Sequence, residues 1–112
     1  MDERINKAEQ LLNFCEKALN YGGEYSRSLV YDDLEKRKAM DRLSTMGSSG
    51  RQTYKLSEKK QVYAHDFNNF ENTINPCLDF LRKNHPSQRD LISRLENCLK
   101  QISELKDFVR DF

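Results

Sequence analysis

Apolar residues recur along the chain at alternating spacings of three and four, the period that places side chains on one face of an α-helix. Between residues 2 and 20, this stripe contains Ile5, Ala8, Leu12, Cys15 and Leu19, and it is widened by Leu11, Phe14 and Ala18. Gly22 and Gly23 follow, and glycine most readily takes the left-handed conformation that ends a helix. The pattern therefore predicts an amphipathic helix over residues 2–20.

A second helix is expected over residues 24–43, because this segment is rich in good helix formers. Its apolar residues form a ragged stripe that contains Leu29, Val30, Leu34, Met40 and Leu43. The pattern does not define how this helix packs. Small residues dominate the next stretch, so residues 44–56 are interpreted as a flexible loop.

The clearest pattern lies in the second half of the chain. One stripe contains Tyr63, Phe67, Phe70, Ile74, Cys77 and Leu81, and the next contains Leu91, Leu95, Cys98, Ile102, Leu105, Val109 and Phe112. These stripes predict helices over residues 57–83 and 88–111, the first of them kinked at Pro76, which lacks a backbone donor. Ser57 is the candidate N-cap of the first, and Ser87 with Asp90 resembles a capping arrangement for the second.

The short break at residues 84–87 predicts that the last two helices form an antiparallel hairpin. A chain of 112 residues fits one domain. We therefore predict an all-α fold, an antiparallel bundle of three to four helices with a long C-terminal helical hairpin. Either the first two helices or a second copy of the chain must cover the apolar stripe of the hairpin, so a homodimer through the hairpin is an alternative.

Composition and charge narrow the class of protein. The net charge is +1, and 37% of the residues are hydrophobic. No apolar run approaches the roughly 18 residues of a membrane span, and the first ten residues lack a signal-peptide layout. We expect a cytoplasmic protein that does not enter membranes. Its three cysteines, Cys15, Cys77 and Cys98, fall on apolar stripes and are expected to be reduced core residues.

Most patterns that carry catalysis or bind metals do not occur in the sequence. There is no glycine-rich phosphate loop, nucleophile elbow, Cys-x-x-Cys or His-x-x-x-His spacing, and His65 and His85 lie 20 positions apart. We therefore expect no metal, no cofactor and no self-sufficient catalytic site.

The most specific motif is the run Ala64-His65-Asp66-Phe67-Asn68-Asn69. It resembles the phosphoacceptor box of one class of sensor histidine kinases, and residues 57–112 resemble the dimerisation and histidine-phosphotransfer hairpin of that family. The resemblance implies that His65 accepts a phosphoryl group, that Asp66 accepts the proton of the other ring nitrogen, and that Asn69 positions water. Independently, a buried Phe67 places His65 on the opposite, solvated face. The alternative is that the motif is only the solvated face of a helix.

Basic residues concentrate in the middle of the chain. Residues 36–60 carry eight basic and two acidic side chains, whereas residues 1–35 carry four basic and eight acidic ones. The candidate partner-binding residues are Lys36, Arg37, Lys38, Arg42, Arg51 and Lys55. Such a segment could meet an acidic protein surface or a phosphate backbone, or it could bind nothing.

The leading hypothesis is a small cytosolic helical module that regulates a protein partner by binding and has no catalytic activity. The partner would present an acidic surface, or would be a kinase or a response regulator. One alternative is a histidine phosphotransfer protein, or a mimic of one, that uses His65. A second is a nucleic-acid-associated protein that uses residues 36–60.

Overall fold

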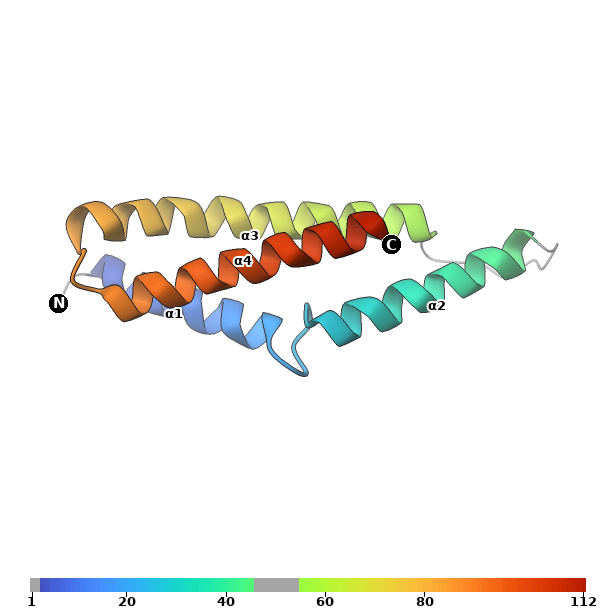
Figure 1. The fold of residues 1–112 in the computed structure, drawn as a ribbon, viewed down its shortest axis with the longest axis horizontal. Helices are drawn as coiled ribbons and strands as arrows, with labels where there is room; N and C mark the ends of the chain where they lie inside the picture. Colours follow the sequence, from blue (N-terminus) through green and yellow to red (C-terminus); the bar gives the residue numbers. More distant parts are fainter. Residues whose placement is uncertain (1–2, 46–54) are drawn as a thin grey trace.

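The computed structural model describes residues 3–45 and 55–112, and these residues form four α-helices (Figure 1). Their bounds are Glu3–Leu19 (α1), Arg27–Thr45 (α2), Leu56–Asn84 (α3) and Arg89–Asp111 (α4). The prediction of an all-α bundle with a C-terminal hairpin is confirmed, because α3 and α4 lie antiparallel along most of their length.

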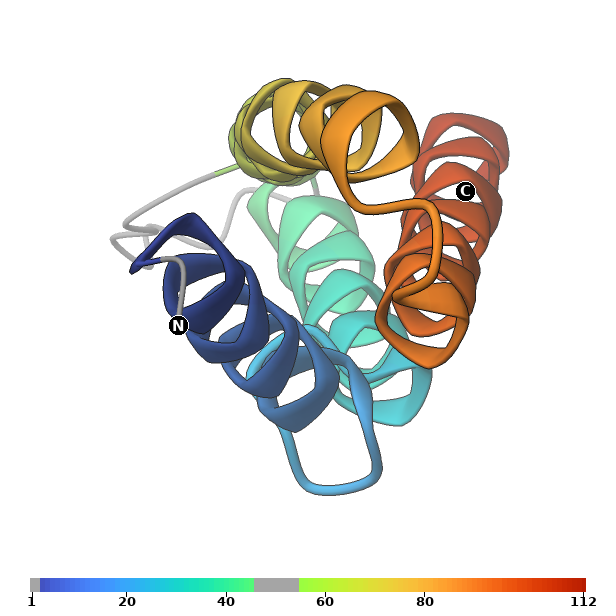
Figure 2. The same ribbon diagram turned by 90° about the vertical axis from the view of Figure 1, so that its left-hand side faces the viewer.

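The bundle is a rod of 61 × 21 × 21 Å in which α1 and α2 follow one another along the hairpin. Figure 1 shows α1 beneath one half of the hairpin and α2 beneath the other, and Figure 2 shows α2 behind α1 when the rod is viewed from its end. A cross-section therefore meets three helices in each half. The two short helices together replace one long third helix.

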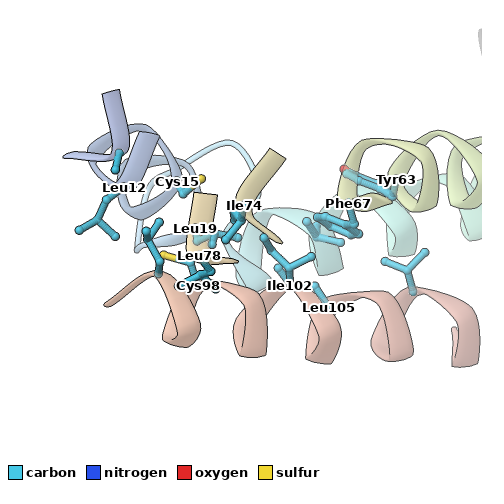
Figure 3. Packing of buried hydrophobic residues seen from close by; sticks show 14 of the residues in the cluster. Leu12, Cys15, Leu19, Tyr63, Phe67, Ile74, Leu78, Cys98, Ile102 and Leu105 are labelled. Carbon is cyan, nitrogen blue, oxygen red and sulfur yellow. The ribbon is translucent and has the colours of Figure 1, made fainter. Parts of the chain in front are cut away.

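The core lies where the predicted stripes meet, and Figure 3 shows part of it. Every predicted α4 position from Leu91 to Val109 is buried. On α3, Tyr63, Phe67, Ile74 and Leu81 are buried as expected, and Leu78 joins them although it lies outside the predicted stripe. Phe70 and Cys77 are half-buried on the flank of α3 that packs against the core. The apolar band of α3 is thus broader than the four-three pattern indicated.

The turn between α1 and α2 depends on its two glycines. Gly22 has a φ of +83°, in the left-handed region. At Gly23, a Cβ atom would lie only 2.2 Å from the carbonyl oxygen of Lys17, so a side chain has no room. The Tyr25 N–H then donates to the Ala18 carbonyl at 2.8 Å. Because this turn occupies residues 20–26, α2 begins at Arg27 and not at residue 24 as predicted.

The start of α3 is held by a contact that local sequence did not indicate. The carboxylate of Asp41 on α2 accepts a hydrogen bond from the Leu56 N–H at 3.0 Å, and Glu58 accepts one from the Lys55 N–H at 3.4 Å. Lys55 is the N-cap residue, so the prediction that Ser57 caps this helix is wrong. A carboxylate from another helix satisfies the exposed donor instead.

Other helix ends also differ from the expected ones. The N-cap of α4 is Gln88 and not Ser87, and its side chain makes no capping bond. Helix α2 includes residues 44–45, which were assigned to the loop, while residues 46–54 of that loop lie outside the described residues. Helix α3 continues through Pro76, which lies on an exposed face. The kink at Pro76 stays a prediction.

The apolar stripe of the hairpin is covered within the chain. Residues of α1 and α2 join it in one continuous core, including Leu12 and Cys15 from α1 and Val30 and Leu34 from α2. Among the described residues, the large hydrophobic side chains that remain exposed belong to α1, α2 and the turn between them. Intramolecular packing therefore occupies the surface through which a hairpin homodimer would form.

Candidate functional site

His65 lies on the exposed face of α3, with its imidazole free of the core. One turn further along, the Asn69 amide nitrogen lies 3.4 Å from His65 Nε2. For that amide to donate, Nε2 must be unprotonated and the ring proton must sit on Nδ1. The geometry therefore brings two of the three motif residues together on one helix face.

Asp66 makes a contact that the resemblance did not indicate. Its Oδ2 atom accepts a hydrogen bond from the Tyr25 hydroxyl at 2.7 Å. The Tyr25 ring packs edge-on against Tyr63, Phe67 and Phe70, at centroid distances of 6.3, 5.6 and 5.4 Å. Asp66 therefore anchors the turn between α1 and α2 to α3.

A second tyrosine–aspartate pair lies further along α3. The Tyr63 hydroxyl donates to Asp33 on α2 at 2.7 Å, and Arg37 also binds Asp33, at 3.0 Å. Burial, followed by the hydrogen bond to the carboxylate, raises the pKa of both Tyr25 and Tyr63 above the usual value. Both phenols therefore hold their protons tightly in the folded protein, and both join α3 to the preceding segment.

Phe14 is the functional candidate that sequence reasoning missed. It was assigned to a widened apolar stripe, yet 62% of its surface is exposed. Its ring stacks on Phe70 of α3 at a centroid distance of 6.0 Å and closes one side of a shallow hollow. The hollow is lined by Leu11, Phe14, Tyr25, Asp66, Asn69, Phe70 and Thr73. The only sequence signal was that Phe14 lies on the far edge of the α1 stripe.

Several basic residues of segment 36–60 make contacts within the fold. Arg37 pairs with Asp33, and the Lys38 ammonium lies 5.4 Å from the centroid of the Phe112 ring. Lys59 approaches Asp33 at 3.9 Å and the Tyr63 ring at 5.1 Å, and Lys60 donates to the Arg110 carbonyl at 3.0 Å. These contacts hold α2 and the end of α4 against α3.

Three further predicted basic residues, Lys36, Arg42 and Lys55, lie at one end of the rod and are exposed. Arg51 lies outside the described residues. We define the distal end as residues 35–43 of α2 with residues 55–62, which precede and begin α3. It carries seven basic and three acidic side chains. The structure thus brings Lys55 together with the α2 cations although 13 or more positions separate them.

The distal end is also the least covered part of the bundle. Helix α4 stops near Lys38 and Lys60, and Figure 1 shows α2 extending beyond the end of α4. In the two segments that form the distal end, no side chain is fully buried. Met40 and Leu56 are half-buried, and Leu43 is 55% exposed. Here two helices carry partly exposed apolar side chains without a third helix over them.

Comparisons leave the family of the chain unassigned, since no protein-family model, curated protein or solved structure matches it. In the part of the chain that the structure describes, no helix has the length and apolarity required to cross a membrane. The described side chains also include no group of three or more His, Cys, Asp or Glu placed to hold a metal ion.

Proposed function

We propose that this chain is a helical protein-interaction module that acts by binding, without chemistry of its own, and that the distal end is its binding surface. The observation that carries the proposal is that α2 and the first turn of α3 continue past the end of α4, and that α2 extends further still (Figure 1). Along most of the hairpin, α1 or α2 lies beside α3 and α4 as a third helix (Figures 1 and 2). The partner would supply a third helix there.

The chemistry of the distal end defines the partner segment. Met40, Leu43 and Leu56 offer partly exposed apolar surface, which an amphipathic helix can cover with its own apolar stripe. Lys36, Lys55 and the neighbouring cations would face the flanks of that helix. Complementary charge speeds association and excludes wrong partners, so the flanks should be acidic.

A protein segment fits this surface better than a nucleic acid does. Asp41 and Glu58 lie among the cations and would repel phosphates, and several of the cations already contact groups of the fold. Leu43 offers an apolar contact that a phosphate backbone cannot use. Nucleic acid therefore serves as the competing ligand in the test.

The test uses a model helix of about 20 residues, with leucine at the core positions of each heptad and glutamate on the flanks. Its binding to the full chain is measured by fluorescence anisotropy at about 50 and about 200 mM NaCl. The Lys36→Glu/Lys55→Glu variant should bind roughly tenfold more weakly, because each exposed charge contributes up to about 1 kcal/mol. Lys83→Glu/Lys100→Glu makes the same change in net charge away from the distal end and should bind like the wild type.

Equal loss of affinity in the two double variants would show that net charge alone governs binding and would overturn the proposal. A scrambled peptide of identical composition should bind weakly, because its leucines do not form a stripe. Tighter binding of a single-stranded RNA of about 20 nucleotides, with affinity falling steeply as salt rises, would instead favour the nucleic-acid alternative.

The second candidate function is histidine phosphotransfer, which the exposure of His65 and its contact with Asn69 favour. The Nδ1 or Nε2 atom would attack the phosphorus of a phosphoryl donor, the leaving group would depart with its electron pair, and the ring proton would pass to solvent. Asp66 would keep its bond to Tyr25 instead of accepting that proton.

Incubation with a small phosphoramidate donor, followed by intact-mass measurement, tests this candidate directly. Phosphotransfer predicts a gain of one phosphoryl group that is lost in acid and is absent from His65→Ala. A gain that persists in His65→Ala would assign the phosphate to another residue. No gain from this donor or from a phosphorylated receiver protein would remove the candidate and leave the binding function standing.

A further inference from the structure

A pocket lies at the junction of the two short helices. Helix α1 ends at Leu19 and α2 begins at Arg27, and both residues line a hollow on one face of α4 (Figure 1). The other lining residues are Gln101, Glu104 and Leu105 of α4, and the volume is about 210 Å³. We call this hollow the junction pocket. A cavity of ~150 Å³ in a protein can hold benzene, so the junction pocket has room for a group of that size.

The floor of the junction pocket is apolar. Leu19 and Leu105 are only 8% and 6% exposed, and both belong to the continuous core of the bundle. An apolar group that enters the pocket therefore leaves water and contacts leucine side chains. That transfer is favourable in proportion to the apolar area that is buried.

Two opposite charges stand at the mouth of the junction pocket. The side chains of Arg27 and Glu104 are exposed, in contrast to the leucines of the floor. The guanidinium carbon of Arg27 lies 5.2 Å from the centroid of the Phe108 ring, and this contact holds the cation at the rim. Among the described residues, neither Arg27 nor Glu104 forms an ion pair. Both charges are therefore available to a ligand.

Neighbouring charges leave this balance unchanged. Asp111 lines the adjoining hollow over Phe108, and its carboxylate already accepts a hydrogen bond from Arg110 at 3.3 Å. Lys100 lies one helical turn before Glu104 but does not line the junction pocket. The charges that line the pocket itself are thus one positive and one negative.

We infer that the junction pocket binds a small zwitterion with an apolar side group, and that its ligands are free α-amino acids with apolar side chains. The ligand side chain packs on Leu19 and Leu105. The ligand carboxylate accepts two parallel hydrogen bonds from the Arg27 guanidinium, and the ligand ammonium donates to the Glu104 carboxylate. An α-amino acid carries both charges on the carbon next to its side chain, as a pocket with charges at the mouth and an apolar floor requires.

Ligands with a single charge fit this pocket less well. A fatty acid brings its carboxylate close to Glu104, and an alkylamine brings its ammonium close to Arg27, so each meets a like charge. A longer peptide carries its terminal ammonium and its terminal carboxylate on different residues and can satisfy only one of the two side chains. The inference is independent of the distal end, none of whose residues lines the junction pocket.

Titration of the isotopically labelled full chain with L-leucine, followed by amide chemical shifts, tests the inference. The shifts should saturate with a Kd of roughly 0.1–1 mM, as expected for a ligand of this size, and should be largest around Leu19, Arg27 and Leu105. Glycine lacks the apolar side chain and should bind at least about tenfold more weakly. Shifts that do not saturate, or that centre on another part of the rod, would overturn the inference.

Two analogues of leucine separate the two charges. N-acetyl-L-leucine lacks the ammonium, and L-leucinamide lacks the carboxylate. Each should bind roughly fivefold more weakly than L-leucine, because one exposed ion pair is lost. If either analogue binds as tightly as L-leucine, the pocket does not recognise a zwitterion and the inference is wrong.

Substitution of the two exposed side chains assigns each charge to a residue. Glu104→Gln should bind L-leucine roughly fivefold more weakly and should no longer prefer it to N-acetyl-L-leucine. Arg27→Gln should lose the preference for L-leucine over L-leucinamide in the same way. Glu35→Gln and Arg89→Gln remove the same charges from exposed positions outside the pocket and should bind like the wild type. Equal weakening in these controls would contradict the assignment and overturn the inference.

Discussion

The Tyr25 hydroxyl donates to the Asp66 carboxylate at 2.7 Å, although 41 positions separate the two residues in the sequence. Asp66 directly follows His65, the residue on which the resemblance to a phosphoacceptor box centres. The bond fixes the turn between α1 and α2 against α3, and the aromatic contacts of Tyr25 reinforce it. The carboxylate next to the candidate phosphoacceptor therefore serves the fold.

Replacing Tyr25 with Phe keeps the ring and removes only this bond. We expect the free energy of unfolding to fall by about 0.5–1.5 kcal/mol, the usual net value of one hydrogen bond. Urea titration followed by circular dichroism measures the change. Tyr21→Phe is the control, because Tyr21 is almost fully exposed. If both variants lose the same stability, the Asp66 bond does not hold the turn.

How much of the fold the sequence could predict depended on the strength of the apolar pattern. The bounds of α4 were predicted almost to the residue. Its apolar positions from Leu91 to Val109 alternate strictly between spacings of four and three, and all of these positions face the core. Among the α2 side chains that the structure describes, only Val30 and Leu34 are buried, so the apolar pattern of α2 could not define its packing. Helices α1 and α2 lie end to end because of the turn between them and their packing on the hairpin. A local sequence pattern cannot predict either feature.

Some features of the candidate sites could likewise be predicted from the sequence, and others could not. The exposure of His65 followed from the helical period, because Phe67 faces the core. The partner of Asp66 could not be predicted, since Tyr25 reaches it from another part of the fold. The role of Phe14 was hidden too, because a residue on the edge of a stripe is buried only if a neighbouring helix covers it. Tertiary packing decides such positions.

Alkaline pH should weaken the fold. The folded protein raises the pKa of Cys15 from 9.0 to about 12 by burial, and it raises the pKa of Tyr25 and Tyr63 above 10.0. The unfolded chain loses these protons first, so stability is complete below pH 9 and falls above it. Tyr63→Phe should reduce the part of the loss that begins near pH 10. Thermal unfolding measured between pH 7 and 11 tests this prediction. A midpoint temperature of unfolding that stays constant up to pH 11 would contradict it.

Helix α2 should be the weakest part of the rod, because Leu34 is the last buried residue among its described side chains. Leu34→Ala leaves a cavity and should cost about 2–5 kcal/mol locally. Hydrogen exchange followed by mass spectrometry should show faster exchange in α2, with α1, the later part of α3 and α4 still protected. Leu43→Ala, at an exposed position, should exchange like the wild type. Uniformly faster exchange in Leu34→Ala would mean that the rod unfolds as a single unit.

The three free thiols should react slowly in the folded protein and differ from one another. Cys15 and Cys98 are buried and Cys77 is only half-buried, and burial raises the pKa of all three. A raised pKa lowers the thiolate fraction, and the thiolate is the form that attacks an alkylating agent. Timed alkylation with iodoacetamide near pH 8, read by peptide mass, should therefore label Cys77 first and the other two only on unfolding. Rapid labelling of Cys15 would show that α1 leaves the hairpin frequently, because that thiol is reached only when the three-helix half opens.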